Sequence, residues 1–386
     1  MRVVLSTPGK FHTFDLAREL YAHGALEAIF TGYPRFKLRN EGLPQELINT
    51  FPWIQVPYMA FPWKHLLPKP IIRQWEYLTA VPFGNWVARK LPACDVYVGL
   101  SGSGLAAGKQ ARKLSAAYIC DRGSAHIRVQ DALLRQEYEK WGVPYSGIDA
   151  RTIAREESEY AEADIITVPS IFAFRSFIEQ GIVAKKLRLL PYGVNVSRFQ
   201  PVAKPAEDRF DVLYVGAMSL QKGIQYLVQA YQKISHFNKS LTVVGAPSPE
   251  LMALLQARNL WPADIKVLGH MPQTELKNIM SRSHVLVLPS IQDGFGMVMA
   301  QAMACGCPVI ASRNTGGEDL FTDGDEGFIV PIRDVDALIE RLQQLADDPE
   351  QRVTMSQRAL ARVHSFGGWN QYGEKAMAIY AEVLQK

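Results

Sequence analysis

The sequence predicts an α/β protein built from two doubly wound domains, each a mainly parallel sheet between layers of helices. Three observations support this prediction. The 386 residues exceed one typical core of about 150–200 residues. Short apolar runs alternate with helical spacing through most of the chain. A polar segment with two prolines, residues 197–209, interrupts this alternation. We expect domains at 1–200 and 201–369, with a last helix, 370–386, packing back on the first domain.

Composition narrows the class of protein. A hydrophobic content of 48% with 21% charged residues is typical of a globular protein in water, and a net charge of +4 is too small to indicate nucleic-acid binding. The four cysteines form no C-x-x-C pair and lack zinc-type spacing, which favours a reducing compartment. Without a signal-peptide pattern or a run of about 18 apolar residues, the expected location is the cytoplasm. Attachment to the inner face of the membrane stays open.

The first domain begins with a strand, a helix and a second strand. Residues 2–5 are an apolar strand, Phe14–His23 has helical spacing, and Leu26–Phe30 is the next strand. Gly9 lies between the first strand and the helix, where a backbone without a Cβ can approach a ligand closely. Further strands are expected at 95–100, 116–120, 164–168 and 187–190, with helices at 151–163 and 171–180.

Residues 33–90 differ in composition. An aromatic-proline pattern occurs twice, as Phe51-Pro52-Trp53 and Phe61-Pro62-Trp63, and residues 51–70 hold five prolines. Eight Lys and Arg stand against three acids, an excess of five that is larger than the +4 of the whole chain. Basic residues mixed with aromatics favour contact with a membrane surface or an anionic acceptor. The alternative is a loop-rich insertion whose aromatic side chains pack on their own domain.

Two polar segments follow strands of the first domain. Ser101-Gly102-Ser103-Gly104 is similar to a dinucleotide-binding loop but lacks the acidic residue expected further on, and close helix packing explains its small residues equally well. Asp121 to His126 follow the strand at 116–120. Ligands of open α/β sheets bind at the carboxyl ends of strands, so this polar cluster is a candidate edge of a site.

The second domain repeats the pattern. Strands are expected at 212–215, 241–245, 265–269 and 285–288, and helices at 224–234, 335–347, 350–363 and 370–385. The loop from Gly216 to Lys222 connects the first of these strands to its helix. A lysine at the start of a helix is well placed to bind a phosphate.

Residues 289–312 combine a loop, a helix and a strand. The loop Asp293-Gly294-Phe295-Gly296 leads into a helix, Met297–Ala304, which Gly306 and Pro308 end, and Pro308–Ala311 is a strand. Helix N-termini have unpaired N–H groups and a partial positive charge, so this loop is a candidate anion site. Asp293 can accept hydrogen bonds from hydroxyls. The alternative is an ordinary turn with a solvated aspartate.

Together these landmarks resemble the family 4 glycosyltransferases, which are retaining enzymes that use nucleotide-sugars and have the two-domain GT-B fold. The markers occur in the family's order: Glu156 with Ala163-Asp164, Tyr192 to Asn195 with Phe199 and Pro201, Gly216 to Gly223, Pro289 to Ala311, Thr315-Gly316-Gly317, and Asp323-Gly324 with Gly327. The similarity extends over almost the whole chain and is strongest from about 156 to 345.

The resemblance implies a role for each candidate residue in a cleft between the domains. Lys222 would neutralise the leaving diphosphate, Asp293 would bind hydroxyls of the transferred sugar, Gln301 would face the ribose, and Gly9 would approach the phosphates. Gly216, Gly294, Phe295 and Gly296 would complete the donor site. The family places a histidine near the reacting carbon where this chain has Asp121 to His126, and either Asp121 or His126 could take that role. The resemblance implies no metal and no cofactor other than the nucleotide-sugar co-substrate.

Three residues depart from the family's pattern. The family usually has two glutamates eight positions apart, where this chain has Asp293 and Gln301. It also usually has an arginine in the phosphate loop, where this chain has Ala217. One expected cation is therefore missing, unless Arg122 or Arg313 substitutes for it.

The expected function is transfer of a sugar, with retention, from a UDP- or GDP-sugar to a glycan or lipid-linked acceptor. A nucleotide-sugar epimerase with the same fold is a second hypothesis, and a non-catalytic module that binds nucleotides or glycans is a third. A dinucleotide-dependent oxidoreductase is the least favoured, because the loop at 101–104 is its only support.

Overall fold

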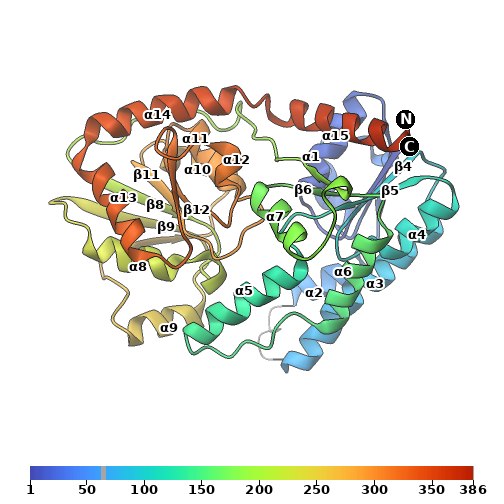
Figure 1. The fold of residues 1–386 in the computed structure, drawn as a ribbon, viewed down its shortest axis with the longest axis horizontal. Coiled ribbons are helices and arrows are strands. Elements are labelled where there is room, and N and C mark those ends of the chain that lie inside the picture. Colours follow the sequence, from blue (N-terminus) through green and yellow to red (C-terminus); the bar gives the residue numbers. More distant parts are fainter. Residues whose placement is uncertain (62–66, 386) are drawn as a thin grey trace.

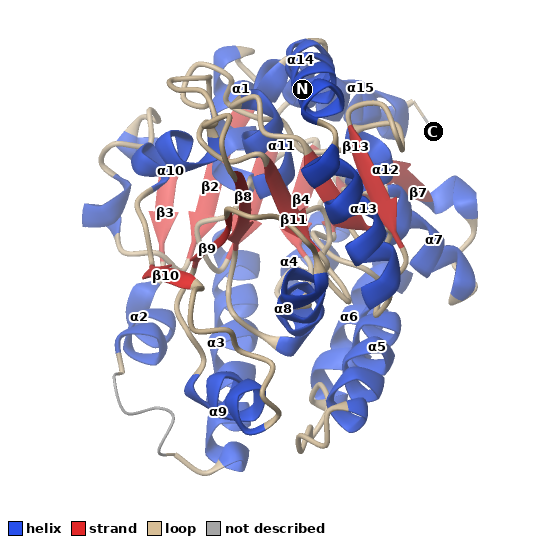
Figure 2. Ribbon diagram, turned by 90° about the vertical axis from the view of Figure 1, so that its left-hand side faces the viewer, coloured by secondary structure: helices blue, strands red, loops and turns tan. Residues whose placement is uncertain are grey.

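The computed structural model describes residues 1–61 and 67–385, which form two lobes side by side (Figure 1). Pro62 and Trp63 of the second aromatic-proline pattern, and Lys64 among the eight basic residues of the segment 33–90, lie outside the described residues. In the view turned by 90°, strands lie between helices on both sides (Figure 2). The expected architecture of two doubly wound α/β domains is confirmed.

The first lobe contains a seven-stranded parallel sheet in the order β3-β2-β1-β4-β5-β6-β7. Its strands are β1 (Val3–Thr7), β2 (Leu26–Thr31), β3 (Ile48–Thr50), β4 (Val96–Leu100), β5 (Ala117–Asp121), β6 (Ile165–Val168) and β7 (Leu187–Leu189). Strands β1 and β6 are buried at every residue, as expected for parallel strands that helices cover on both faces. The strand order reverses between β1 and β4, so a ligand crevice is expected at the carboxyl ends of these two strands.

Seven helices accompany this sheet in the described part of the first lobe. They are α1 (Thr13–Ala22), α2 (Pro52–Ala60), α3 (Lys69–Lys90), α4 (Leu105–Lys113), α5 (Ile127–Lys140), α6 (Ala150–Glu162) and α7 (Ile171–Glu179). Each predicted helix of this lobe forms within one residue of its expected bounds.

Residues 33–90 are not the loop-rich insertion that the second interpretation expected, because α2 and α3 cover much of the segment. The prolines suggested loops, but a helix tolerates proline at some positions. Pro52 lies in the first turn of α2, where no backbone donor is needed. Some of the aromatic side chains do pack on their own lobe, and Phe51 stacks on Trp86 with ring centroids 5.2 Å apart. Trp53 instead leaves 76% of its surface exposed.

The second lobe repeats the topology with six parallel strands in the order β10-β9-β8-β11-β12-β13. They are β8 (Phe210–Val215), β9 (Lys239–Val244), β10 (Lys266–Gly269), β11 (Val285–Leu288), β12 (Val309–Ser312) and β13 (Gly327–Val330). Its helices are α8 (Ile224–Lys233), α9 (Pro249–Ala257), α10 (Gln273–Met280), α11 (Met297–Ala304), α12 (Gly317–Leu320), α13 (Val335–Asp347) and α14 (Pro349–His364). Its order reverses between β8 and β11.

Two helices link the lobes. The last helix, α15 (Gly368–Leu384), returns to the first lobe and packs along α1, with Tyr372 and Tyr380 buried in that lobe's core (Figure 1). In the opposite direction, the end of α5 reaches the second lobe. Trp141 joins the second lobe's core, and the buried Glu137 accepts hydrogen bonds from Tyr226 at 2.8 Å and Arg333 at 2.7 Å. These contacts hold the lobes against each other.

Within the described residues, no helix is long and apolar enough to cross a membrane.

Candidate functional site

Two connected cavities lie where the sheets' carboxyl ends face each other. The larger measures about 1310 Å³ and is lined mostly by the first lobe, and the smaller measures about 380 Å³ and is lined mostly by the second. Gly123, Tyr192 and Met297 line both, so the cavities meet at these residues. This is the position that the reversal of strand order predicts for ligands in both sheets.

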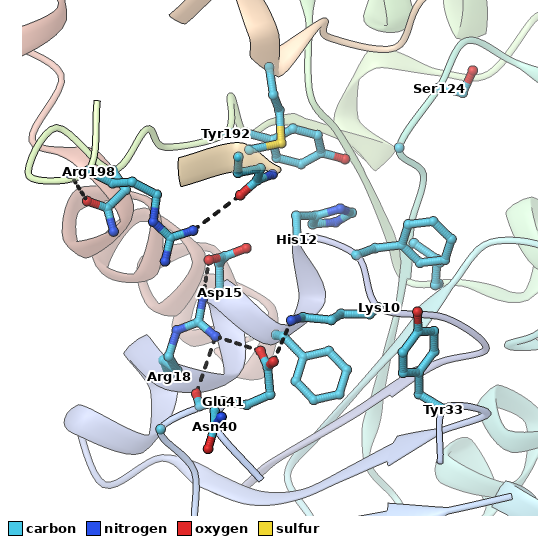
Figure 3. Close-up of a pocket in the computed structure, with 18 of the residues that line it drawn as sticks. Lys10, His12, Asp15, Arg18, Tyr33, Asn40, Glu41, Ser124, Tyr192 and Arg198 are labelled. Atoms are coloured by element: carbon cyan, nitrogen blue, oxygen red, sulfur yellow. Dashed lines mark hydrogen bonds and ion pairs between the residues drawn. The ribbon is translucent and has the colours of Figure 1, made fainter. Parts of the chain in front are cut away.

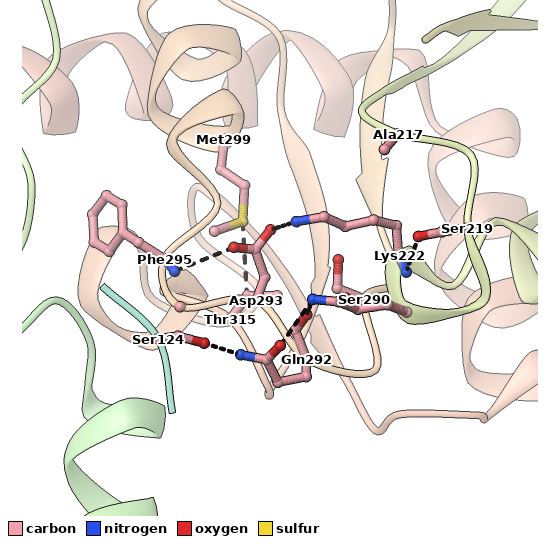
Figure 4. A network of polar contacts seen from close by, with 12 residues as sticks. Ser124, Ala217, Ser219, Lys222, Ser290, Gln292, Asp293, Phe295, Met299 and Thr315 are labelled. Atoms are coloured by element: carbon pink, nitrogen blue, oxygen red, sulfur yellow. Dashed lines mark hydrogen bonds and ion pairs between the residues drawn. The ribbon is translucent and has the colours of Figure 1, made fainter. Parts of the chain in front are cut away.

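The smaller cavity contains most of the donor-site residues that the sequence predicted. Its lining includes Gly216, Lys222, Asp293, Phe295, Gly296 and Gln301. The Lys222 ammonium lies 2.5 Å from the carboxylate of Asp293 (Figure 4). The two side chains expected to contact diphosphate and sugar therefore pair with each other.

Local backbone geometry explains how these two residues meet. Gly223 has φ 73°, and a Cβ there would lie 1.9 Å from the carbonyl oxygen of Pro289, so only glycine allows the two loops to pack this closely. Ser219 caps the short turn that carries Lys222. Gly296, with φ 77°, begins α11 without a side-chain cap, and Gly296, Met297 and Val298 at the start of this helix all line the smaller cavity.

Gly294 and Gly9 occupy different positions from those expected. A Cβ on Gly294 would lie 1.9 Å from the Gly123 carbonyl oxygen, and its own carbonyl accepts a hydrogen bond from Ser170 Oγ at 2.6 Å. Gly294 is thus a close contact between the lobes and does not line the cavities. Gly9 is buried, and its carbonyl accepts from Thr7 at 3.2 Å. The residues that follow Gly9 in its loop line the larger cavity.

Asp121 is brought together with a residue that the sequence did not single out. Its Oδ2 lies 2.6 Å from His12 Nε2, and its Oδ1 accepts from Thr167 at 2.9 Å. The His12 ring stacks on Tyr192, with centroids 4.2 Å apart, and lines the larger cavity (Figure 3). The sequence indicates His12 only weakly, through its position after Gly9 in the loop that follows β1, where the strand order reverses.

His126 lies apart from this pair. It caps α5, with Nδ1 accepting from Arg128 N at 3.3 Å, and its ring packs against Tyr160 and Phe177. Burial, with the charge of Arg122 acting in the same direction, lowers the pKa of His126 to about 4. His126 lines neither cavity.

Neither arginine considered as a substitute cation reaches the smaller cavity. Arg122 is buried and lies 2.6 Å from Glu156, which also accepts from Ser101 and Tyr160. Arg313 is exposed and lines neither cavity. Ala217 does line the smaller cavity. Within the described part of the chain, Lys222 is therefore the only cation in its lining, and Asp293 the only acid.

The glycine-rich loop at 101–104 is already occupied. The Glu159 carboxyl group accepts hydrogen bonds from the backbone N–H groups of Gly102 at 2.6 Å, Gly104 at 2.9 Å and Leu105 at 3.1 Å. Burial, reinforced by the charge of Glu156, raises the pKa of Glu159 to about 8. A phosphate cannot use these amides without displacing Glu159, so the loop is no dinucleotide site in this conformation.

The larger cavity has a polar wall in the first lobe. Lys10 and Arg18 both pair with Glu41, and Arg18 also pairs with Asp15 (Figure 3). Arg198 reaches the cavity from the other side and donates to Gln273 at 3.2 Å. Such alternating charges offer hydrogen-bond donors and acceptors to a ligand rich in hydroxyls. Among the described residues, no three His, Cys, Asp or Glu side chains group as metal ligands would.

Comparison with known proteins agrees with this geometry. Residues 196–362 match the family model of glycosyl transferases group 1. The chain is 28% identical over 181 residues to alpha-D-kanosaminyltransferase of Streptomyces kanamyceticus, a match that covers 46% of this chain and 47% of that protein. It is 29% identical to D-inositol 3-phosphate glycosyltransferase of Kribbella flavida over 52% of each chain. The chain spans about half the length of the curated relatives it matches.

Solved structures match over nearly the full length. Sucrose-phosphate synthase of Thermosynechococcus elongatus superposes with a TM-score of 0.75 at 22% identity, over 100% of this chain and 99% of that one. Alr3699/HepE of Anabaena, solved with UDP and glucose, gives 0.72 at 14% identity, over 99% and 100%. These likenesses establish the GT-B fold. The match of residues 196–362 shows that this part of the chain, most of the second lobe, is similar to the group 1 glycosyl transferases, as the motifs predicted.

Proposed function

We propose that this protein is a retaining, metal-independent glycosyltransferase that moves a sugar from a UDP- or GDP-sugar to a glycan or lipid-linked acceptor. The observation that carries the proposal is the pairing of Lys222 with Asp293 at the start of α11, in a cavity that opens onto a second, larger one. One cavity suits a nucleotide-sugar and the other suits an acceptor.

The geometry supports separate roles for the groups that line the smaller cavity. The N–H groups at the start of α11 and the Lys222 ammonium would bind the diphosphate, because both carry positive charge toward the same space. As the bond to the sugar breaks, negative charge grows on the leaving phosphate, and these fixed groups stabilise it. Diphosphate binding would release Asp293 from Lys222 to accept hydrogen bonds from sugar hydroxyls. Gly216 allows close approach of the donor, Phe295 and Gly296 shape its phosphate pocket, and Gln301 would contact the ribose.

The two cavities also favour transfer over the other hypotheses. An epimerase on this fold must hold one nucleotide-sugar, whereas the larger cavity of about 1310 Å³ leaves room for a second substrate. A purely binding module has no need to place Lys222 where a leaving group would develop charge. HepE was solved with UDP, which supports testing UDP-sugars first.

Removing the Lys222 ammonium tests the proposal. We expect Lys222→Ala to weaken binding of UDP or GDP and to lower transfer by roughly 100- to 1000-fold, as for loss of one charge-stabilising donor. Calorimetry would measure nucleotide binding, and product analysis with UDP-glucose and GDP-mannose would measure transfer. Lys233→Ala, which removes an exposed lysine from the same lobe, is the matched control. Wild-type turnover by Lys222→Ala would refute the assigned role.

We also propose that the segment 33–90 contacts a membrane surface and so brings a lipid-linked acceptor to the larger cavity. Helix α2 contains no charged residue, and its Trp53 and Met59 are exposed at 76% and 53%. An uncharged helix with an exposed tryptophan, in a segment with a positive excess, suits the interface of an anionic bilayer.

Flotation with anionic vesicles tests this contact. Trp53→Ala, alone and combined with Trp63→Ala, should reduce the fraction of protein that floats. Phe237→Ala is the control, because Phe237 is 87% exposed but lies on the second lobe between α8 and β9. Equal flotation of all variants would exclude α2 as the contact.

A further inference from the structure

We infer that a cavity in the first lobe, away from the proposed transfer site, binds a phosphodiester group through the guanidinium groups of Arg73 and Arg155. The cavity measures about 320 Å³ and lies between the first part of α3, the loop before α6 and the start of α6. It shares no lining residue with the two cavities of the cleft. The inference deepens the proposed membrane contact, and it rests on that contact only for the source of the phosphodiester.

Arg155 brings to this cavity a charged group that lacks an acceptor. Its side chain is half-buried, and its Nε and Nη1 atoms are buried without a hydrogen bond to any described residue. The guanidinium group lies 5.3 Å from the centre of the Tyr77 ring, a contact that supplies no hydrogen-bond acceptor in the plane of the fork. Buried donors without an acceptor are uncommon in folded proteins. An anion at this wall would supply the missing acceptor.

Three more groups bring hydrogen-bond donors to the same space. Arg73 donates through Nη2 to the carbonyl oxygens of Ser146 and Gly147, both at 2.6 Å, and it forms no ion pair with a described residue. The loop thus positions this guanidinium group without neutralising its charge. The hydroxyls of Tyr145 and Thr152 line the cavity and make no hydrogen bond to a described residue. Guanidinium forks and hydroxyls are the groups with which proteins bind phosphate oxygens.

The two acids of the cavity wall are already engaged. Both oxygens of Asp149 accept hydrogen bonds from Arg151, and the hydrogen bond from this side chain lowers the pKa of Asp149 to about 2. Glu76 accepts from the Tyr58 hydroxyl at 2.8 Å. With Arg151 counted beside its partner, three arginines stand against two carboxylates, an excess of one positive charge. A phosphodiester has a single negative charge and balances that excess.

A buried carboxyl group close to Arg155 does not remove the excess. Glu159 interacts with the charge of Arg155, but burial raises the pKa of Glu159 to about 8. Glu159 is therefore largely protonated at neutral pH, and the charge of Arg155 stays available to a ligand.

The position of the cavity indicates a lipid headgroup as the source of the phosphodiester. Glu76 connects the cavity wall to Tyr58 of α2, the uncharged helix that exposes Trp53. If α2 lies in the interface of a bilayer, the cavity lies near the headgroups, where the phosphodiesters of anionic phospholipids are concentrated. A headgroup bound in the cavity would fix the orientation of the first lobe on the membrane.

The test offers the headgroup with and without its lipid. Line broadening in phosphorus NMR measures binding of soluble glycerophosphoglycerol, and flotation is measured with vesicles of phosphatidylglycerol in phosphatidylcholine and of phosphatidylcholine alone. Arg155→Gln should weaken binding of the soluble probe by about tenfold or more and lower flotation with the anionic vesicles, as for loss of a charge-assisted donor. Arg89→Gln removes an exposed charge near the other end of α3, and this matched control should bind the probe like wild type.

Further variants separate this site from the neighbouring proposals. Arg155→Lys keeps the charge without the fork, so probe binding should fall less than in Arg155→Gln. Trp53→Ala should lower flotation and leave binding of the soluble probe unchanged. Calorimetry with UDP and GDP should give equal nucleotide affinity for wild type and Arg155→Gln, which shows that the variant is folded. If Arg155→Gln loses this affinity, Arg155→Lys decides the test.

The outcomes distinguish the proposals from one another. If the probe binds through Arg155 while all variants float equally, the site holds and its phosphodiester belongs to a soluble molecule. Wild type that binds the probe but neither nucleotide would refute the proposed transferase and leave this site standing. The inference is overturned if wild type binds neither the probe nor the anionic vesicles. It is also overturned if Arg155→Gln and Arg89→Gln change binding equally, because only general surface charge would then matter.

Discussion

The two glycine-rich loops after β4 and β11 occupy similar positions in their lobes, but their backbone N–H groups differ in whether a side chain of the protein binds them. Each follows a buried strand, contains two glycines and leads into a helix. At 101–104 the amides bind the Glu159 carboxyl group from within the fold. At 293–296 the only side chain among the described residues that accepts from the loop is Asp293, in a long 3.4 Å contact to Phe295 N, and that carboxylate is also bound to Lys222.

The difference shows that glycine content does not by itself make a phosphate site. A loop of this kind has free N–H groups, and burial requires that something satisfy them. In the first lobe the partner is permanent and comes from α6. In the second lobe the Asp293 N–H donates to the Asn314 carbonyl oxygen at 3.0 Å, but the N–H groups of Gly294 and Gly296 have no acceptor among the described residues. Replacing the residue that satisfies the first loop should therefore affect stability, and replacing a residue of the second loop should affect catalysis.

The largest effect is expected on stability, from removal of the Glu159 side chain that binds the loop at 101–104. Glu159→Ala leaves three backbone N–H groups without their acceptor, so we expect the free energy of unfolding to fall by about 3 kcal/mol or more. Urea unfolding would measure it. Glu162→Ala at the end of the same helix removes only a partly exposed ion pair with Lys109 and Arg112, and should cost at most about 1 kcal/mol. Equal losses for both variants would show that the loop does not depend on Glu159.

The pH dependence of stability gives a second test of Glu159. Its pKa is about 8 in the folded protein, against 4.5 for an ordinary glutamate. Between these values the folded state binds more protons than the unfolded state, so stability falls as pH rises from about 4.5 through 8, by up to about 1.4 kcal/mol per pH unit. Glu159→Gln cannot lose a proton, so this part of the slope should disappear. An unchanged slope would mean that another group causes it.

In the donor loop, the sharpest test is Gly294→Ala. The added Cβ would lie 1.9 Å from the Gly123 carbonyl oxygen, so the lobes must move apart. Since small misplacements of reacting groups are costly, we expect kcat/KM to fall about 100-fold with little loss of stability. Gly24→Ala is the control: Gly24 has φ 66° with nothing within 4 Å, so it should lose stability and keep turnover. The reverse pattern would contradict the comparison.

Local signals predicted much of the fold. Helix α11 forms at Met297–Ala304, the range expected from its flanking glycines and proline. Helices α2 and α3 were missed because prolines usually end helices, yet here Pro57 and Pro82 lie inside them. No element was predicted for residues 127–149, where α5 forms. Its Glu137 suggests a solvated position, although the side chain is fully buried against Tyr226 and Arg333.

The residues of the candidate site also fall into two groups, those that the sequence could place and those that it could not. Lys222 and Asp293 could be placed from loops that adjoin their own strands. His12 could not, because its partner Asp121 lies 109 positions away and only the pairing of β1, β4 and β5 brings them together. The same limit explains His126: its residue type and position after β5 suggested the cleft, but the backbone of the turn directs it between Tyr160 and Phe177. The sequence shows which loop carries a residue, but it does not show the direction in which the side chain points.

The smallest expected effect comes from adding a charge to the open loop. Ala217 lines the smaller cavity where the family usually has an arginine, and neither Arg122 nor Arg313 replaces it. Ala217→Arg should tighten UDP or GDP binding by less than about tenfold, because position 217 is exposed and water screens the new charge. Calorimetry at low and high salt would measure it, and the gain should shrink as salt rises.

Ala217→Gln is the matched control for that gain, since it adds a long polar side chain without a charge. If glutamine tightens binding as much as arginine, the improvement comes from hydrogen bonding and not from charge. If neither variant changes affinity, Lys222 and the amides at the start of α11 already satisfy the diphosphate. In that case the missing arginine marks a site that depends on backbone N–H groups more than on cations, which is the property that distinguishes this loop from its counterpart at 101–104.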